Sequence, residues 1–329
     1  MQIIVCSGDS HTWGEGASGM DTAFDPPAQP GEARNAPFGP PCYVNLLRRR
    51  LCSDYAELLP SALERNGVSG FTREGERAWF SGEMTLPFVG CFGRVQLYCS
   101  PQGAPASLSI DGSERAVFDT FSQTPTYRWL PCWTTDGAHT LRLRSARPMA
   151  LYRAEWFGGE TAVLNSGVGS CPATRYLADD WQSHVEQYRP AIVILETHAI
   201  NDWIQGTTLD TYTRTLTEMV RRTRTAGAKP LLVTVEPIAG DTYLGGHRFG
   251  PQYFGRSGIE FTAYIEATRA VAQTERVPLA DAYAAVAARL ETYPDDAARY
   301  AALYHDNWHP NDLGHQIYAE TILQTFRSL

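Results

Sequence analysis

The second half of the chain alternates short apolar runs with amphipathic helical patterns. Apolar runs at residues 161–165, 191–195 and 231–235 predict strands, and helical patterns lie at residues 210–226, 259–275 and 282–290. Strands that alternate with helices form a parallel sheet whose two faces are covered by those helices. The run at residues 2–6 shares the Ile and Val content of the other strands, so we assign it to the same sheet. The expected fold class is α/β.

A different pattern occupies residues 71–157. Period-two runs lie at residues 94–98, 107–110 and 139–144, and the turn signals Asp111-Gly112 and Asp136-Gly137 separate them. Such runs predict an antiparallel β-sandwich. We therefore expect one α/β domain, made of residues 1–65 and 158–329, with an inserted β-sandwich at residues 66–157. A long loop at residues 14–41, rich in Gly, Pro and Ala, precedes a predicted helix whose apolar stripe is Tyr43, Leu46, Leu47 and Leu51.

Composition excludes several classes of function. Hydrophobic residues make up 43% of the 329 residues, which is ample for a buried core. The 28 basic residues are outnumbered by 36 acidic ones and form no block, so we expect neither a nucleic-acid nor an anionic-membrane partner. No stretch approaches the roughly 18 apolar residues of a membrane span. Homo-oligomerisation stays open.

The cysteines and the first residues bear on the expected compartment. Seven cysteines, an odd number without a C-x-x-C pair, fit reduced thiols better than a disulfide framework. The run Met1–Cys6 has no basic region and no apolar segment followed by a cleavage site. We expect a cytoplasmic protein.

Four short segments lie where an α/β fold binds ligands, beyond the carboxyl ends of its strands. Three of them follow predicted strands, and the fourth precedes the last helix. They are Ser7–Gly14, Asn165–Ser170, Ala199–Trp203 and Asp306–Asn311.

The residue types in these segments suit ester hydrolysis. Serine needs a base to become a nucleophile, histidine is the base suited to neutral pH, and a carboxylate fixes the histidine tautomer. Ser10, His309 and Asp306 could supply these three roles. Hydrogen-bond donors for the developing oxyanion could come from the amide of Asn201 and from the turn at residues 167–170.

Each segment also has an ordinary structural interpretation. Gly-Asp-Ser is a common turn, Asn-Asp is a common helix cap, and an Asp-x-x-His pair arises by chance in a chain of this length. The four together, in this order and at these places, favour chemistry over these separate interpretations.

In these segments the sequence resembles the SGNH/GDSL hydrolase superfamily, over roughly residues 1–52 and 160–329. The resemblance implies a flavodoxin-like three-layer αβα sandwich, and the inserted segment, which we expect to be jelly-roll-like, lies outside it. It also implies that Ser10 is the nucleophile and one backbone oxyanion donor, that Asn201 is the side-chain oxyanion donor, and that His309 is the base with Asp306 as its partner. Asp9 is expected to brace the turn, and we expect Ser10 to lie on an exposed turn. No cofactor is implied.

Two positions depart from the family pattern. The second segment ends in Ser170 where the family has a glycine that gives a backbone N–H. That donor survives if the local φ is negative, so we keep Ser170 as the donor with Gly169 as the alternative. The third segment begins with Ala199 in place of a glycine that shapes the turn.

Some residues allow rival interpretations. His305 and His309 are four residues apart and, with Asp306, Asp312 and His315, could bind a metal, but Pro310 disfavours a helix there. We therefore expect no metal. Cys171 follows the glycine-rich segment and is expected to be structural.

Tryptophans suggest a substrate class. Trp13, Trp203 and Trp308 lie within three residues of a candidate catalytic residue, where they could contact a sugar ring or merely wall off the cleft. We interpret the chain as a serine esterase that hydrolyses O-acetyl or other short acyl esters, with a carbohydrate as the substrate. The alternatives are a lipase, thioesterase or arylesterase, and a catalytically silent carbohydrate-binding protein.

Overall fold

The structure is a computed structural model that describes residues 1–18, 41–74, 77–123, 126–239 and 258–329. Most of the expected loop at residues 14–41 therefore lies outside the described residues. The contacts divide the chain into two compact units: one holds Leu51–Ala162 with the first two residues, and the other holds Val163–Leu329 with the segments before residue 51 that begin at Ile3. None of the described helices is long and apolar enough to span a membrane.

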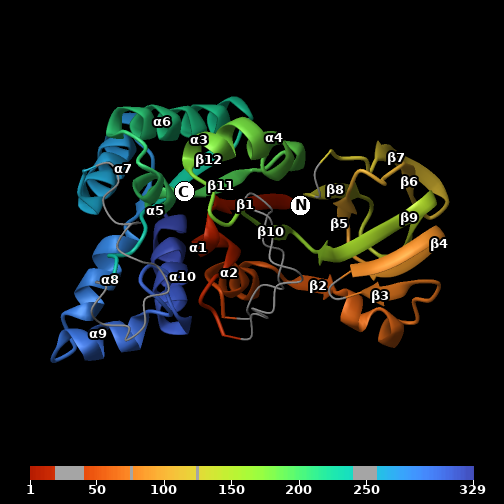
Figure 1. The fold of residues 1–329 in the computed structure, drawn as a ribbon, viewed down its shortest axis with the longest axis horizontal. Helices are drawn as coiled ribbons and strands as arrows, with labels where there is room; N and C mark the ends of the chain where they lie inside the picture. Colours follow the sequence, from red (N-terminus) through yellow and green to blue (C-terminus); the bar gives the residue numbers. More distant parts are fainter. Residues whose placement is uncertain (19–40, 75–76, 124–125, 240–257) are drawn as a thin grey trace. The chain divides into compact units, whose positions relative to one another are not determined.

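The larger unit is built on a five-stranded sheet (Figure 1). The pairs that join β1, β11, β12 and β13 are parallel. Numbered along the chain within this sheet, the strand order is 2-1-3-4-5, which is the flavodoxin-like order. The strands, across the sheet, are β10 (Thr161–Gly167), β1 (Gln2–Gly8), β11 (Ile192–Glu196), β12 (Lys229–Val233) and β13 (Leu279–Ala280).

Helices cover both faces of this sheet (Figure 1). Each predicted helix and strand of the α/β pattern begins and ends within two residues of its expected bounds, because each buries one continuous apolar stripe or run. The α/β class is thereby confirmed. The main helices are α2 (Tyr43–Leu51), α6 (Leu209–Thr225), α7 (Phe261–Glu275), α8 (Ala282–Leu290) and α10 (Asp312–Phe326).

Short elements are not apparent from the sequence. A run of helical turns occupies residues 173–188, and the helices α1 (Ser10–Trp13), α5 (Ala199–Gln205) and α9 (Asp296–Leu303) are each eight residues or fewer. Helices of one or two turns show too little periodicity to be recognised, and isolated helices of this length are unstable without tertiary contacts or caps. Asp9, for example, accepts the backbone N–H of His11 at the start of α1.

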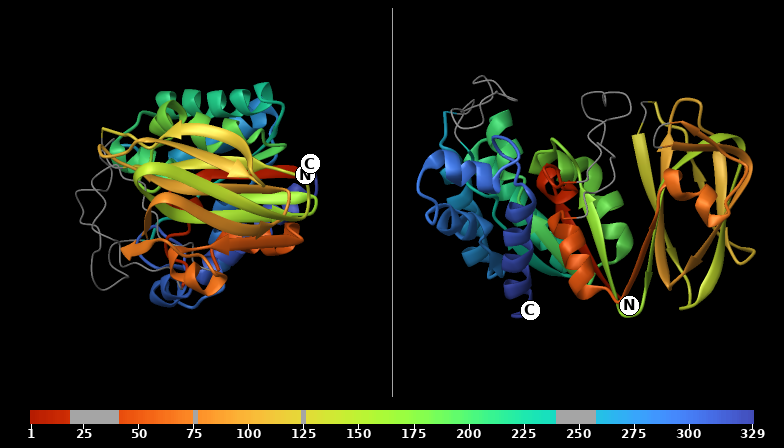
Figure 2. Two further views of the ribbon diagram at one scale, coloured as in Figure 1. Left: turned by 90° about the vertical axis from the view of Figure 1, so that its right-hand side faces the viewer. Right: turned by 90° about the horizontal axis from the view of Figure 1, so that it is seen from below.

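The smaller unit consists of antiparallel strands that are joined through one long strand, β9 (Ala138–Gly158), as Figure 2 shows from two directions. The first part of β9 pairs with β4 and β6, and its last part pairs with β5 and β2. All the strands of this unit are therefore joined in one hydrogen-bonded network. The other strands are β2 (Asp54–Leu58), β3 (Thr72–Glu74), β4 (Arg77–Val89), β5 (Phe92–Cys99), β6 (Pro105–Ile110), β7 (Ser113–Asp119) and β8 (Thr126–Trp133).

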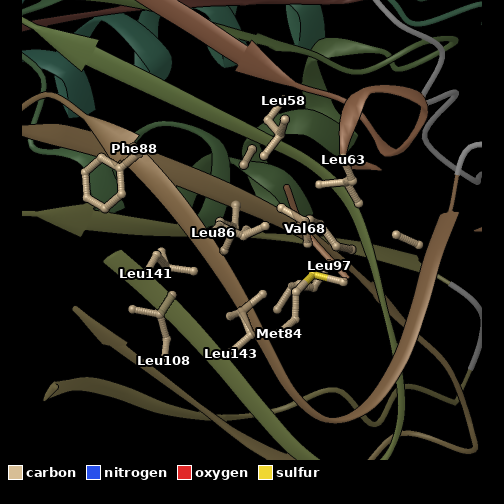
Figure 3. Close-up of a cluster of buried hydrophobic side chains, with 14 of the residues drawn as sticks. Leu58, Leu63, Val68, Met84, Leu86, Phe88, Leu97, Leu108, Leu141 and Leu143 are labelled. Atoms are coloured by element: carbon tan, nitrogen blue, oxygen red, sulfur yellow. The ribbon is translucent and has the colours of Figure 1, made fainter. Parts of the chain in front are cut away.

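The core of this unit follows from the period-two pattern. Along β4 the buried side chains Met84, Leu86 and Phe88 alternate with exposed ones, so one face of the strand points inward. They pack against Leu141 and Leu143 of β9 in one apolar cluster (Figure 3). The Asp111-Gly112 turn joins β6 to β7 with φ of 50° and 81°, as a two-residue hairpin of type I′ requires.

The unit begins earlier and ends later than the expected residues 66–157. β2 pairs with the end of β9, with Asp54 opposite Gly158, and Leu58 contributes to the apolar cluster. The run at residues 54–58 is short and its side chains alternate between exposed and half-buried until Leu58, so its sequence does not mark it as a strand. Only the partner strand shows to which unit it belongs.

Candidate active site

The structure brings Ser10, His309 and Asp306 together although 299 residues separate the first two. Ser10 Oγ lies 2.9 Å from His309 Nε2, and His309 Nδ1 lies 2.9 Å from both carboxylate oxygens of Asp306. An ionised carboxylate only accepts hydrogen bonds, so Nδ1 carries the proton and the lone pair of Nε2 faces the Ser10 hydroxyl. This is the geometry that a serine nucleophile and its base require.

Ser10 is positioned by the strand that precedes it. β1 ends at Gly8, Asp9 caps α1, and Ser10 is the first residue of that helix. Ser10 is only 4% exposed, so the expectation of an exposed turn was wrong. The Gly-Asp-Ser signal predicts a turn but not its depth, which depends on the segment packed against it.

That segment is the end of β10 with the glycine-rich turn that follows it. A Cβ on Gly167 would lie 2.3 Å from the backbone nitrogen of Trp13, so only glycine allows the two backbones to approach this closely. The side-chain amide of Asn165 donates to the carbonyl of Thr12 at 2.8 Å. The second segment therefore holds α1 in place in addition to any role in oxyanion binding.

The candidate backbone donor in that turn needs a correction. Ser170 has a φ of 57°, in the left-handed region, so the condition of a negative φ on which its assignment depended is not met. Gly169, the alternative donor, does not share that positive φ. At the third segment the left-handed residue is His198, with a φ of 57°, so the turn forms without a glycine at Ala199.

Asn201 contacts the turn that carries Ser10. Its side-chain amide donates to Asp9 Oδ2 at 2.7 Å, and Asp9 Oδ1 accepts both the backbone N–H and Nδ1 of His11. Asp9 thus braces the turn, as expected for a residue that does not react. One amide hydrogen of Asn201 is engaged in this way, which fixes the direction of the other.

The loop that carries His309, between α9 and α10, is organised around Asp306. Its Oδ1 accepts the backbone N–H groups of Trp308 and His309, at 3.1 and 2.9 Å. Burial alone would raise the pKa of the Asp306 carboxyl, but the charge of His309 and these hydrogen bonds hold it well below its usual range. Asp306 therefore stays ionised and keeps the His309 ring in one orientation.

The pKa of His309 is raised above its ordinary value of 6.5. Burial acts to lower this pKa, but the carboxylates of Glu15 and Asp306 outweigh it by stabilising the imidazolium. Glu15 Oε2 lies 3.5 Å from His309 Nε2, which is the nitrogen that faces Ser10. Glu15 is almost fully buried, at 2% exposed.

The buried residues near the site that were missed from the sequence include His11, Glu15, Glu196 and Glu236. His11 and Glu15 lie within five residues of Ser10 along the chain, and that nearness was the available signal. Glu236 follows β12, so its place beyond a strand end could have marked it. Its Oε1 lies 3.3 Å from His11 Nε2, and its Oε2 accepts the hydroxyl of Tyr318.

Two residues of the metal alternative, His315 and Asp312, have other contacts. His315 is fully buried and donates from Nε2 to the carbonyl of Glu15, and burial lowers its pKa to about 3. Asp312 accepts the backbone N–H and hydroxyl of Ser18. In the part of the chain that the structure describes, two clusters bring three possible ligand atoms together: Asp9, His11 and Glu196, and Glu15, Asp306 and His309. His305, Asp312 and His315 belong to neither.

Cys171 is buried, and its burial raises the pKa of its thiol well above the ordinary value. Such a thiol carries little thiolate near neutral pH and is a poor nucleophile. In the described residues, which include all seven cysteines, no disulfide is formed.

The three tryptophans near the site are buried. Trp13, Trp203 and Trp308 are 2–4% exposed, and the indole N–H of Trp203 donates to the carbonyl of Ile259. They form walls of the fold in this structure, and none presents an open face for a sugar ring. The size of an aromatic side chain does not show which side of a turn it will occupy.

Comparisons with known proteins agree with this geometry. A profile of the GDSL-like Lipase/Acylhydrolase family matches residues 134–317, which is more than half of the chain and includes Asn201, Asp306 and His309. A comparison with curated protein sequences found no match.

Solved structures with a similar fold include a peptidoglycan O-acetylesterase, which is 17% identical with a TM-score of 0.57 over 100% of this chain and 91% of that one. The protein YxiM from Bacillus subtilis is 14% identical, with a TM-score of 0.46 over 83% of this chain and 90% of that one. An acetylxylan esterase from Geobacillus stearothermophilus is 24% identical, with a TM-score of 0.38 over 50% of this chain and 72% of that one.

At these identities a structural likeness speaks for the fold, and here it confirms the SGNH hydrolase fold with its additional antiparallel unit. The family match adds the class of reaction. The chain belongs to the GDSL-like lipase/acylhydrolase family and is a carboxylic ester hydrolase.

Proposed function

We propose that the protein is a serine esterase that removes O-acetyl or other short acyl groups from a carbohydrate through a triad of Ser10, His309 and Asp306. The observation that carries the proposal is the pair of contacts at His309, with Ser10 Oγ 2.9 Å from Nε2 and Asp306 on Nδ1. All three residues are at most 5% exposed, and a site that excludes water strengthens each of these polar contacts.

The reaction proceeds in two halves. His309 Nε2 takes the hydroxyl proton as Ser10 Oγ attacks the ester carbonyl, and Asp306 stabilises the imidazolium that forms. The imidazolium then protonates the departing alcohol oxygen, which leaves an acyl group on Ser10. Water, deprotonated by the same imidazole, attacks this acyl-enzyme and releases the carboxylic acid and free Ser10.

Negative charge on the carbonyl oxygen requires donors that are already in place. The backbone N–H of Ser10 is one, since it lies at the start of α1. The second hydrogen of the Asn201 amide is another, because its first hydrogen is held by Asp9. The third is the backbone N–H of Gly169, because the condition of a negative φ is not met at Ser170.

A carbohydrate substrate is supported by analogy. A structural neighbour that aligns over this whole chain is a peptidoglycan O-acetylesterase. The alignment includes the smaller unit of strands β2 to β9, here called the β-rich unit, along with the larger unit. The buried tryptophans lend no further support, so the substrate class depends on this likeness.

A panel of substrates tests the proposal. Acetate release from acetylated oligosaccharides, compared with turnover of p-nitrophenyl acetate and p-nitrophenyl octanoate, should favour the acetyl esters. Preference for octanoate would indicate a lipase or thioesterase, and absence of turnover on every ester would indicate a binding protein. EDTA should leave activity unchanged, and loss of activity on chelation would favour the metal alternative.

Ser10→Ala should lower turnover on the order of 10³-fold or more, and a serine-directed phosphonate should label the wild type but not this variant. His309→Ala should be about as damaging, and Asp306→Ala should also lower turnover. His305→Ala is the matched control for the base, because His305 lies on the same loop. Activity lost in His305→Ala and kept in His309→Ala would overturn the assignment.

A further inference from the structure

His11 occupies a buried position between the two segments that carry the proposed nucleophile and base. It follows Ser10 in α1, and no part of it is exposed. Its Nδ1 lies 2.8 Å from Asp9 Oδ1, in the nucleophile turn, and its Nε2 lies 2.7 Å from the backbone carbonyl of Trp308, in the base loop. The ring therefore joins two segments that are 297 residues apart.

The partners of His11 determine its protonation. A backbone carbonyl can only accept, so Nε2 must carry a hydrogen. Asp9 Oδ1 also accepts the backbone N–H of His11, and Oδ2 accepts the amide of Asn201, so the carboxylate of Asp9 acts as an acceptor on both oxygens. Nδ1 must then carry a hydrogen as well. An imidazole with hydrogens on both nitrogens is a cation.

We propose that His11 is a buried imidazolium that acts as a positioning residue, clamping the turn that carries Ser10 to the loop that carries His309. The inference rests on the proposed function, which assigns Ser10 and His309 their roles. It adds a further polar link between the two segments, beside the contact of Ser10 with His309.

The surroundings of His11 favour its charged form. Burial acts to lower the pKa of His11, but the carboxylates of Glu236 and Asp9 raise it well above the ordinary value. Glu236 is itself held by the hydroxyl of Tyr318 from α10. The carboxyl groups of Glu236 and Asp9 therefore favour the charged form of the buried ring.

The cation also acts on the base. The rings of His11 and His309 are 5.2 Å apart, and a positive neighbour at this distance disfavours protonation of His309. It opposes the effect of the carboxylates beside His309 and so helps to keep the base neutral. The ionisable groups that face the two rings are Asp9, Glu15, Glu196, Glu236, Asp306 and His315.

The clamp extends to the proposed oxyanion donor. Asp9 holds His11 with one oxygen and the Asn201 amide with the other, at 2.7 Å. Removing the cation would leave the Asp9 carboxylate buried and under-compensated, and its hold on Asn201 would change with it. The effect on catalysis should therefore fall on kcat more than on KM.

The first test uses the wild-type protein. Nitrogen–proton correlation spectra of the ¹⁵N-labelled histidine rings should show His11 with hydrogens on both nitrogens from about pH 5 to about pH 8. Its signals are assigned by correlation to its own backbone, so no variant is needed. A neutral His11 ring at pH 7 would overturn the proposal, whatever the outcome for Ser10.

The second test compares two matched variants. His139, in the β-rich unit, lies in the same way between a carboxylate and a carbonyl, with Nδ1 2.6 Å from Asp111 Oδ2 and Nε2 2.8 Å from the Thr135 carbonyl. His11→Gln should lower kcat about 10²-fold with KM within about twofold. It should also move the acid limb of the pH profile, where activity rises as His309 loses its proton, to a pH about one unit higher. His139→Gln should change none of these.

The outcomes separate the roles. A folded His11→Gln variant with wild-type kcat and an unmoved acid limb would contradict the clamp. Loss of kcat together with a lower thermal midpoint but an unmoved limb would show a purely structural role, and would also contradict it. If Ser10→Ala kept full activity, the proposed function would fail, while the protonation state of His11 would stand on its own spectrum.

Discussion

At the scale of single residues, the pKa of His309 depends on neighbouring charges of both signs. As the proposed base, His309 must be neutral to accept the Ser10 proton, so we expect activity to rise as the pH passes upward through the pKa of His309. The sequence alone predicts an apparent pKa near 6 to 7 for this limb, at about the ordinary histidine value. Because the buried Glu15 and Asp306 carboxylates raise the pKa of His309, we expect the limb above 6.5. The pH dependence of kcat/KM measures it.

Glu15 can be tested by removing its charge alone. Glu15→Gln should move the acid limb to lower pH, by up to about one unit, because the imidazolium loses an anionic neighbour 3.5 Å from Nε2. Glu320→Gln, on the exposed side of α10, is the matched control and should leave the limb in place. An unmoved limb in Glu15→Gln would mean that Glu15 does not carry a charge against His309. The direction is opposite to that expected for His11→Gln.

Ser170 has a conformational cost that glycine would avoid. An L-residue at a φ of 57° is strained by about 1 kcal/mol, and the side chain of Ser170 is exposed. Ser170→Gly should therefore raise the free energy of unfolding by up to about 1 kcal/mol, less the entropy that glycine adds to the unfolded chain. Urea denaturation measures it, with Ser113→Gly in the exposed strand β7 as a control that should destabilise. A lower urea midpoint for Ser170→Gly would show that the serine side chain contributes to the turn.

At the scale of elements, the helix α1, which begins at Ser10, depends on the end of β10. Gly167→Ala would place a Cβ 2.3 Å from the Trp13 nitrogen and 2.8 Å from the Asp9 carbonyl oxygen, both of which are backbone atoms that cannot rotate away. We expect α1 to shift and kcat to fall about 10²-fold, since a displacement of about 1 Å is enough for such a loss. Steady-state kinetics on p-nitrophenyl acetate measures it.

The contrast for this variant is Gly227→Ala. Gly227 has a φ of 80° with open space around it, so alanine there strains the backbone without touching another segment. It should cost about 1 kcal/mol of stability and leave kcat unchanged. If both variants lost activity alike, the loss in Gly167→Ala would reflect general destabilisation and not contact with α1.

At the scale of the whole molecule, the chain enters and leaves the β-rich unit at neighbouring residues. Asp54 lies opposite Gly158, and a Cβ on Gly159 would meet the side chain of Ser53. Replacing residues 54–158 with a short linker should therefore leave the larger unit able to fold and to turn over p-nitrophenyl acetate. A variant in which only residues 71–157 are replaced should not fold stably. In it β2 loses its partner β9, and the apolar side chains of Leu58 and Leu63 become exposed. Circular dichroism and thermal unfolding distinguish the two variants, and equal behaviour would contradict these boundaries.

Replacing residues 54–158 also tests whether the β-rich unit contributes to substrate recognition. Activity on an acetylated oligosaccharide should fall further than activity on p-nitrophenyl acetate, because the smaller ester needs only the triad and the oxyanion donors. Equal losses on the two substrates would assign the unit a structural role alone.

The sequence by itself determined the elements and the candidate reacting groups. Apolar periodicity located each helix and strand that it predicted in the α/β pattern within two residues. The four polar segments, with the family that they resemble, pointed to Ser10, Asp306 and His309. These are local properties: a stripe or a turn is written in consecutive residues, and parallel strands bring their carboxyl ends to one edge whatever lies between them.

Only the tertiary structure decided what surrounds those groups. The burial of Trp13 and Ser10, the left-handed φ of Ser170, and the two acceptors of His11 depend on packing, in the last case on a partner 297 residues away. No local pattern encodes such a contact, because a histidine beside a serine has the same propensity whether it faces solvent or lies between two carboxylates. The charge of His11, and with it the pH range of His309, is a property of packing.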